Sequence, residues 1–194
     1  MMKKRLTSLA LSAMMVLSMV PATAFAAKDA GTPPTYNSAT GCYEISTPAQ
    51  LLYLSGKWKD GAPRDGHYVL TADIDMSGVK GFKPIASKKA EGFTGTFDGQ
   101  FHSIKGLRVE YEKKYAGLFG YVGNQDDQAY IKNVALLDCY VTGQQNVGAL
   151  AGVNYGTITG CVVTGEVKCL DLSNSHTAGG ICGKLKEGEG PIVG

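Results

Sequence analysis

The sequence lacks the short motifs that mark several common classes of enzyme and binding protein. It contains no C-x-x-C pair, which argues against a zinc knuckle, and no H-E-x-x-H segment, which excludes a zinc-protease centre of that type. Gly148, Gly152 and Gly156 fit neither the G-x-x-x-x-G-K-[ST] nor the G-x-G-x-x-G pattern, so a phosphate or dinucleotide loop is not expected there. We therefore expect no cofactor.

Proline is scarce, and an excess of basic residues is absent. Only 7 of the 194 residues are proline, whereas 26 are glycine, most of them after position 90. Abundant glycine without proline or low complexity indicates short strands joined by tight turns rather than disorder. The formal charge of +2 includes three basic residues within 1–26, so the rest of the chain carries 16 basic and 17 acidic side chains. This balance does not indicate a nucleic-acid partner, which would require a basic patch.

Residues 1–26 have the pattern of a signal peptide. Three basic residues at positions 3–5 precede an uncharged, mostly apolar stretch over 6–20, and Ala24 and Ala26 supply small residues before the expected cleavage site. A stretch of about 15 residues is short for a membrane span of about 20, so a retained anchor is the less favoured alternative. Since no second stretch of this kind occurs, we expect a secreted or cell-surface protein that meets the membrane only through this signal.

The cysteines are odd in number. An exported chain with five cysteines keeps at least one of them unpaired, or paired outside the chain. We expect several of them to be small buried hydrophobic residues, and a disulfide between two of them stays open. They are Cys42, Cys139, Cys161, Cys169 and Cys182.

The N-terminal part of the exported chain is expected to precede the main fold. Residues 27–40 are polar and carry two prolines, which indicates a flexible lead-in. Residues 41–90 are expected to form a cap that begins with a short strand at 41–45. A helix should start at Ser46 or Thr47, with Pro48 in its first turn, and an alternating strand should cover 67–76.

Two interleaved sequence modules repeat through the rest of the chain. The first reads Ile-x-x-apolar-x-apolar and begins at Ile104, Ile131 and Ile158, which are 27 residues apart. The second recurs every 31 to 32 residues and places an apolar residue between two glycines. Its positions are Gly117, Leu118 and Gly120, then Gly148, Leu150 and Gly152, then Gly179, Ile181 and Gly183. Because the insertions fall in the loops between modules, the pattern is that of a stacked array.

The repeats predict an all-β fold, a right-handed parallel β-helix or β-solenoid over residues 91–194. Short strands of successive coils would stack about 4.8 Å apart, and Ile104, Ile131 and Ile158 would form one inward ladder. Val141 matches Val167 in this array only if one residue bulges. A strand near residue 192 would begin a further copy, so we expect an array that is cut off, with an open edge able to associate end to end.

Several segments resemble GLUG repeats, in which Gly-Leu-x-Gly is followed by Asn-x-Gly-x-Ile and a strand. They are YAGLFGYV, VGALAGVNYGTITGCVVTGEV and AGGICG, and GFTGTFDGQFHSIKGLRV is similar to the lead-in of such proteins. TPAQLLYLS and YVLTADIDMSG fit their cap, so the resemblance spans 45–194, with departures at Phe101 and Ala149, where glycine is common. The resemblance implies a bacterial surface or secreted protein, either an adhesin-like array or an accessory region of a surface protease, and implies no catalytic residues.

The remaining candidate sites are weak. Asp98 and His102 stand four apart in FDGQFH as a candidate acid–base pair, but Asp-Gly is also a turn signal, and we prefer the turn. Asp73 and Asp75 share one face of the expected strand and offer too few oxygens for calcium. The segment GNQDDQ is preferred as a polar surface loop over a cation site. We expect no catalytic and no metal-binding residues.

These observations favour a non-catalytic, exported β-solenoid module that acts as a spacer or as an adhesin-like binding region. Its partner is unknown, with a host or environmental glycan or protein as the expected class, and the binding surface is an outer face or the loops YEKKY and GNQDDQ. Two alternatives stay open, namely a polysaccharide-degrading enzyme, by analogy of fold alone, and an accessory region of a larger surface protease. For the first, Lys105, Arg108 and Lys132 are candidate neighbours, without a paired carboxylate.

Overall fold

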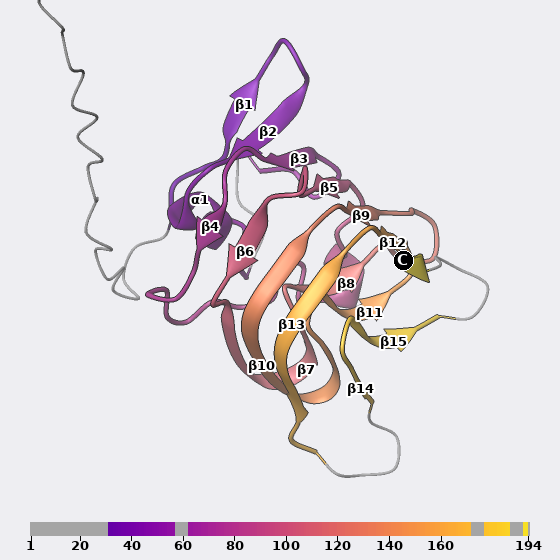
Figure 1. Cartoon of the computed structure of the whole chain (residues 1–194). Coiled ribbons are helices and arrows are strands. Elements are labelled where there is room, and N and C mark those ends of the chain that lie inside the picture. The colour runs from indigo at the N-terminus through magenta and orange to yellow at the C-terminus, as the bar shows by residue number, and fades with distance from the viewer. Residues whose placement is uncertain (1–30, 57–61, 172–176, 187–191, 194) are drawn as a thin grey trace, which may run out of the picture.

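The computed structural model describes residues 31–56, 62–171, 177–186 and 192–193. Strands of successive coils stack in parallel and form a β-solenoid of about four turns with very little helix (Figure 1). This confirms the all-β solenoid predicted from the repeats. The expected signal peptide, with its cleavage positions Ala24 and Ala26, lies outside the described residues.

Among the residues that the structure describes, the first sheet has seven strands in the order β1-β2-β3-β5-β9-β12-β16. They are β1 (Thr35–Asn37), β2 (Cys42–Ile45), β3 (His67–Leu70), β5 (Thr96–Asp98), β9 (Tyr130–Lys132), β12 (Thr157–Thr159) and β16 (Ile192–Val193). β1 and β2 form an antiparallel hairpin that projects from one end of the stack, and the later pairings are parallel (Figure 1). Ile192 pairs with Ile158, where the sequence predicts a further copy to begin.

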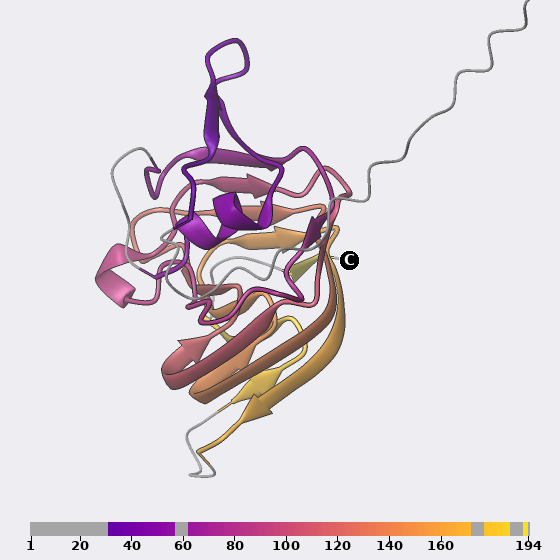
Figure 2. The same ribbon diagram turned by 90° about the vertical axis from the view of Figure 1, so that its left-hand side faces the viewer.

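Two further sheets complete each coil. The second sheet has the order β13-β10-β6-β4, with β7 and β14 also paired to β10, and the third has the order β15-β11-β8. The second sheet contains β4 (Ile74–Asp75), β6 (Ser103–Lys105), β7 (Arg108–Ala116), β10 (Ala135–Gly148), β13 (Val162–Cys169) and β14 (Ala178–Gly179). The third contains β8 (Phe119–Val122), β11 (Ala151–Asn154) and β15 (Cys182–Leu185). In Figure 2 the colours follow one another along the stack, so each coil lies beside the one before it.

The first helix begins where the sequence predicts. α1 (Pro48–Tyr53) has Thr47 as its N-cap, and the Thr47 hydroxyl accepts a hydrogen bond from the Gln50 backbone N–H at 3.3 Å. This bond satisfies one of the amide groups that a helix start leaves without a partner. A second, single-turn helix, η1 (Lys89–Glu91), lies in the loop before β5.

Two N-terminal expectations need correction. The lead-in expected over 27–40 contains strand β1, because Asn37 Nδ2 donates to Glu44 Oε1 at 2.7 Å and fixes the hairpin with β2. The single strand expected over 67–76 is divided between β3 and β4, which belong to different sheets. The Thr71 backbone N–H donates to the Ile45 carbonyl at 2.9 Å at the end of β3, so a corner of the solenoid interrupts the alternating pattern.

The register of the coils corrects the ladder expected from the first module. Ile131 pairs with Ile158, as predicted, but its partner in the preceding coil is Phe97. Ile104 pairs instead with Leu136, in the second sheet. Ile104 is therefore not a member of the ladder that contains Ile131 and Ile158.

The length of one corner explains this difference. From Phe97 to Ile104 the chain advances seven residues, whereas from Ile131 to the equivalent Leu136 it advances five. The longer corner contains 99–102, in which Gln100 and Phe101 both have positive φ values, +47° and +64°. In the sequence alone, an isoleucine just after the corner of one coil therefore looks the same as an isoleucine just before the corner of the next coil.

The glycine-containing module stacks as predicted. The Leu118 N–H donates to the Ala149 carbonyl at 2.9 Å, and the Leu150 N–H donates to the Ile181 carbonyl at 3.0 Å, so equivalent residues of three coils are neighbours. The bulge needed to match Val141 with Val167 is also present, between positions 136 and 139 of β10.

The second glycine of each module lies inside a strand of the third sheet. A Cβ on Gly152 would lie 2.7 Å from the Cα of Tyr115, a residue of the preceding coil with φ of +68°. Gly120 faces Ala86 in the same way, and Ala86 also has a positive φ, +55°. These glycines leave room for a left-handed backbone segment of the neighbouring coil, which no larger residue would allow.

The core fills the inside of the solenoid and contains a chain of aromatic contacts. Ring centroids lie 5.2 Å apart for Tyr43 and Tyr68, 6.0 Å for Tyr68 and Phe93, and 5.1 Å for Phe93 and Phe119. Phe97 meets Phe119 edge to face at 5.5 Å. Aromatic packing thus continues across the N-terminal coils, where large side chains replace the isoleucines of the later ones.

Candidate functional site

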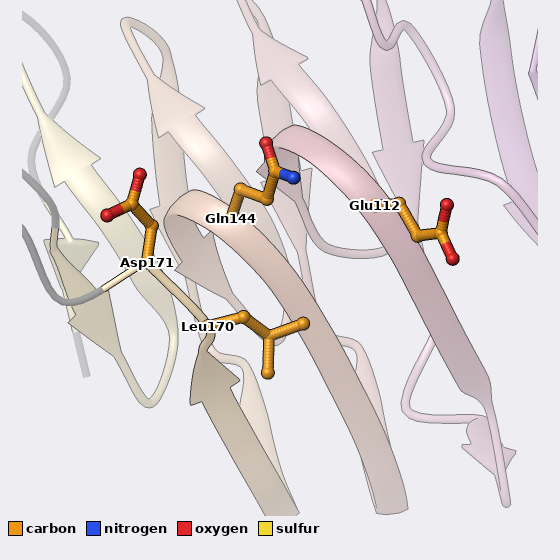
Figure 3. Close-up of a pocket in the computed structure, with 4 residues that line it drawn as sticks. All are labelled: Glu112, Gln144, Leu170 and Asp171. Atoms are coloured by element: carbon orange, nitrogen blue, oxygen red, sulfur yellow. The ribbon is translucent and has the colours of Figure 1, made fainter.

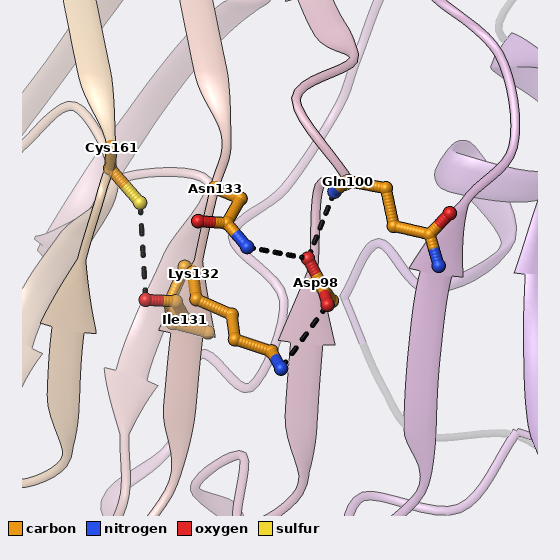
Figure 4. Close-up of polar contacts among 6 residues, drawn as sticks. All are labelled: Asp98, Gln100, Ile131, Lys132, Asn133 and Cys161. Atoms are coloured by element: carbon orange, nitrogen blue, oxygen red, sulfur yellow. Dashed lines mark hydrogen bonds and ion pairs between the residues drawn. The ribbon is translucent and has the colours of Figure 1, made fainter.

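Asp98 holds one corner of the solenoid together. Its carboxylate accepts hydrogen bonds from the Gln100 backbone N–H at 2.9 Å and from Asn133 Nδ2 at 3.2 Å, and it forms an ion pair with Lys132 Nζ at 3.2 Å (Figure 4). The first contact is the turn expected from the Asp-Gly sequence. The other two join this corner to the next coil.

His102 does not pair with Asp98. Its Nδ1 atom lies 3.4 Å from Asp73 Oδ1, and the same carboxylate accepts the Ser103 backbone N–H at 2.7 Å. Asp75 accepts the Ser77 backbone N–H at 2.9 Å. The structure therefore brings His102 together with Asp73 and uses the candidate carboxylates as acceptors for backbone groups.

The other charged candidates of the sequence are also engaged locally. Lys105 Nζ lies 3.7 Å from Asp138, and Arg108 Nη2 donates to Glu110 at 2.8 Å. In GNQDDQ, Asn124 Oδ1 accepts the backbone N–H groups of residues 126 and 127, both at 2.8 Å, so this segment closes on itself as a surface loop. Together with Lys132, the basic candidates contact three different carboxylates rather than one shared site.

Three other kinds of site can be judged among the described residues, namely metal sites, reactive thiols and membrane-spanning helices. Within 31–56, 62–171, 177–186 and 192–193, no group of three or more His, Cys, Asp or Glu side chains is placed to hold a metal ion. All five cysteines are free thiols, and burial raises the pKa of Cys139, of Cys161 and, to about 11, of Cys182. A thiol with a raised pKa is a poor nucleophile at neutral pH. Among these residues, no helix is long and apolar enough to cross a membrane.

The contacts of Asp98 predict a pH-dependent contribution to stability. Partial burial raises the pKa of the carboxyl, but the hydrogen bonds from Gln100 and Asn133 and the Lys132 ammonium outweigh burial and hold the pKa below its usual value. A lowered pKa in the folded state gives stability that is complete above the unfolded pKa, about 4, and is lost as the pH falls through the folded value.

Replacing Asp98 by asparagine should therefore lower the free energy of unfolding by about 1 kcal/mol at neutral pH. The difference between the two proteins should begin to shrink below about pH 4, where the carboxyl of the unfolded chain becomes protonated, and should be lost as the pH falls through the lower pKa of the folded state. Urea unfolding of both proteins at a series of pH values measures this difference in the free energy of unfolding. A difference that is the same at neutral and acidic pH would show that the charge of Asp98 contributes nothing.

A small pocket lies where three successive coils turn. It has a volume of about 630 Å³ and is lined by Glu112 of β7, Gln144 of β10, and Leu170 and Asp171, which follow β13. In the view of Figure 3, Gln144 lies between the two carboxylates. Leu170 is 58% exposed, so the pocket has an apolar side chain open to solvent.

The larger hollow is a groove beside β7, with a volume of about 1040 Å³. The segment YEKKY, expected to be a loop, is part of β7 and forms one wall, because β7 pairs with β10 from residue 108 to 116. Residues 81–83, 87 and 88 form the opposite wall, together with 55 and 56. We call this hollow the β7 groove.

Sequence reasoning identified one wall of the β7 groove and missed the other. Lys83 and Lys88 come from the preceding coil, about 30 residues upstream of the strand that they face. Ile85 forms a bridge with Phe119, an offset of 34 residues. Applying the 31- to 32-residue period upstream of residue 91 would have placed residues 81–83 beside β7.

Comparisons with known proteins give partial similarities. No protein-family model matches the chain. Halomucin of Haloquadratum walsbyi is 33% identical over 151 residues, which cover 73% of this chain and 2% of halomucin. A "Putative Gly-rich membrane protein" of Evansella cellulosilytica is 34% identical over 125 residues, which cover 60% of this chain and 14% of that protein. The chain thus spans a small part of the length of the curated relatives that it matches.

Among solved structures, the chain is similar to a "putative immunoglobulin A1 protease" from Bacteroides ovatus. The TM-score is 0.42 at 18% sequence identity, and the match covers 86% of this chain and 67% of that one.

Proposed function

We propose that this chain is an exported β-solenoid module of the cell surface that binds a ligand through the β7 groove and does not itself catalyse a reaction. The signal-peptide pattern of residues 1–26 supports export. The names of the relatives, halomucin and a Gly-rich membrane protein, support a place at the cell surface. The resemblance to GLUG repeats supports an adhesin-like role within a longer surface protein.

The single observation that carries the proposal is the β7 groove itself. It has a volume of about 1040 Å³, and its walls come from two coils that are joined by the bridge between Ile85 and Phe119. Concave sites with aromatic and polar walls are the usual form of a ligand site. By contrast, Asp98, the carboxylate that the sequence offered for catalysis, accepts a backbone amide group, and so does Asp73, which the sequence offered as part of a calcium site.

Arrays of glycans and of extracellular proteins test this function. The full chain should bind a defined set of spots, and a Tyr111→Ala variant, with its fold checked by circular dichroism, should lose most of that signal because Tyr111 lines the groove. A Tyr36→Ala variant, which removes an exposed tyrosine outside the groove, should bind as the unmodified chain does. The absence of binding on both arrays would contradict a binding function and favour a role as a spacer.

One observation favours the enzymatic alternative. Glu112 and Asp171 line the same small pocket. The catalytic residues of a glycosidase are usually a pair of carboxylates. In this second candidate function the small pocket, rather than the β7 groove, would hold the polysaccharide. The Asp171→Asn variant separates the two, since Asp171 lines the small pocket and not the β7 groove, so only the enzymatic function would be lost in it.

A further inference from the structure

We propose that the β7 groove binds a linear anionic glycan, one whose sugar rings carry carboxylate or sulfate groups. The proposal rests on the binding function proposed above and names its ligand class. It is carried by the continuity of the groove, its surplus of positive charge, and its half-buried tyrosines.

The groove is longer than a single hollow. A neighbouring depression of about 360 Å³, lined by Lys80 and Arg108 among others, shares three lining residues with the β7 groove. The shared residues are Gly81, Phe82 and Glu110. The two hollows are therefore neighbours along β7, and we call the pair of them the channel. An extended polymer fits such a channel better than a compact ligand does.

Basic side chains outnumber acidic ones along this channel. Glu110 is already paired with Arg108 at 2.8 Å, and Lys88 with Glu91 at 3.1 Å. Within the described part of the chain, no ion pair engages Lys83, Lys113 or Lys114. The basic residues are Lys80, Lys83, Lys88, Arg108, Lys113 and Lys114, and the acidic ones are Glu110 and Glu112.

This charge is local rather than a property of the whole chain. After residue 26 the chain has 16 basic and 17 acidic side chains, so the surplus in the channel is balanced elsewhere. A smaller hollow near Arg64, for example, is lined by Asp65, Asp126 and Asp127. A groove that concentrates one sign of charge attracts ligands of the opposite sign.

A bulge in β7 lies at two of the lysines. Tyr111 pairs with Gly143 and Lys114 with Gln145, so two residues of β7 lie opposite one residue of β10. Lys113 and Lys114 lie at this bulge, and both line the groove. Bulges are common beside functional sites, where they change the direction of side chains.

Two half-buried tyrosines give the groove a surface for sugar rings. Tyr111 packs against the main core, and the Tyr115 ring lies 4.7 Å from the ring of Tyr121. Tyr121 is only 4% exposed, so it holds the Tyr115 ring in place. Fixed aromatic rings lose little entropy on binding and can stack on the apolar C–H face of a pyranose.

The glutamates of the groove favour a glycan over a nucleic acid. A nucleic-acid strand presents a phosphate at every nucleotide, and Glu112 would repel it. A glycan with one charge per ring also carries hydroxyl groups, which can donate to the carboxylates while the lysines contact the sugar acid groups. The mixture of lysine, tyrosine and glutamate therefore fits an anionic polysaccharide.

Titration calorimetry of the full chain with three polymers tests this inference. Polygalacturonate carries carboxylates, dextran sulfate carries sulfates, and dextran is neutral. We expect binding to at least one of the anionic polymers and none to dextran. The affinity should fall as the salt concentration rises, because salt screens the exposed charges of the basic side chains in the channel. Binding to only one anionic polymer identifies which acid group the groove prefers, and either result supports the proposal.

A matched pair of variants locates the site. The double substitution Lys113→Gln, Lys114→Gln should weaken anionic-polymer binding about tenfold. The double substitution Lys89→Gln, Lys184→Gln makes the same change in net charge at exposed residues that do not line the channel, and should leave the affinity within about twofold. An equal loss in both variants would overturn the assignment of the ligand to this groove.

The remaining outcomes separate this inference from the function on which it rests. Equal affinity for dextran, or tighter binding to duplex DNA than to either anionic polymer, would overturn the glycan assignment. Failure of all three polymers to bind, together with positive spots on the arrays, would overturn the ligand class and leave the binding function standing. The absence of binding on the arrays would overturn both the ligand class and the binding function.

Discussion

Replacing Phe119 by alanine is expected to lower the free energy of unfolding by about 4 kcal/mol. The side chain is fully buried, and its ring meets Phe93 and Phe97 at 5.1 and 5.5 Å. Truncation removes buried apolar surface and leaves a cavity that rigid strands on either side cannot fill, which costs about 3–5 kcal/mol for this type of change. Because domains are stable by only about 5–15 kcal/mol, urea unfolding followed by circular dichroism should show a large shift.

Phe101 provides the matched control. Its side chain is 83% exposed, so Phe101→Ala should change stability by less than about 0.5 kcal/mol. A loss of less than about 1 kcal/mol for Phe119→Ala would contradict the placement of Phe119 at the centre of the solenoid core.

Gly148→Ala is expected to have the second large effect, about 3 kcal/mol or more. A Cβ at this position would lie 2.5 Å from the Gly183 nitrogen and 2.7 Å from the Cys182 Cα, and would also meet the Ala151 carbonyl oxygen. These are backbone atoms of the same coil and of the next one, so no side chain can move away to make room. Overpacking of a well-packed interior costs about 1–3 kcal/mol, and more where backbone must move.

Gly180→Ala is the control for this prediction. A Cβ on Gly180 meets nothing within 4 Å, and the equivalent residue of the preceding coil is already an alanine, Ala149. This substitution should be tolerated within about 0.5 kcal/mol in the same unfolding assay. If Gly148→Ala and Gly180→Ala unfold at the same urea concentration, the close approach of the two coils at Gly148 is wrong.

The repeats of the sequence predict the solenoid because stacking imposes the same constraint on every coil. Gly117 and Gly148 lie where one coil approaches the next closely, and glycine recurs with the coil length at position 179, so the repeat is visible in the sequence. The register of the first coil could not be predicted in the same way. Apolar residues occur on both sides of a corner, and only the three-dimensional path shows that the 99–102 turn is two residues longer than its successors.

The candidate site was predictable only in part, for a related reason. YEKKY was a visible cluster of charge and tyrosine, but its facing wall comes from an irregular segment without a repeat signature. The net charge near zero also concealed the basic channel, since residues that are distant in sequence supply its charges. Asp98 and His102 show the converse case, in which residues four apart in sequence turn toward different partners.

The most direct test of this account is to incubate the full chain with polygalacturonate and with dextran sulfate, and to measure both the retention of the chain and the length of each polymer. We predict that the chain binds at least one of the two polymers, that Lys113→Gln, Lys114→Gln weakens the binding, and that polymer length stays constant with no new reducing or unsaturated ends. Shortening of a polymer that disappears in Asp171→Asn would contradict a non-catalytic binding module and show that the small pocket, which Asp171 lines, is an active site.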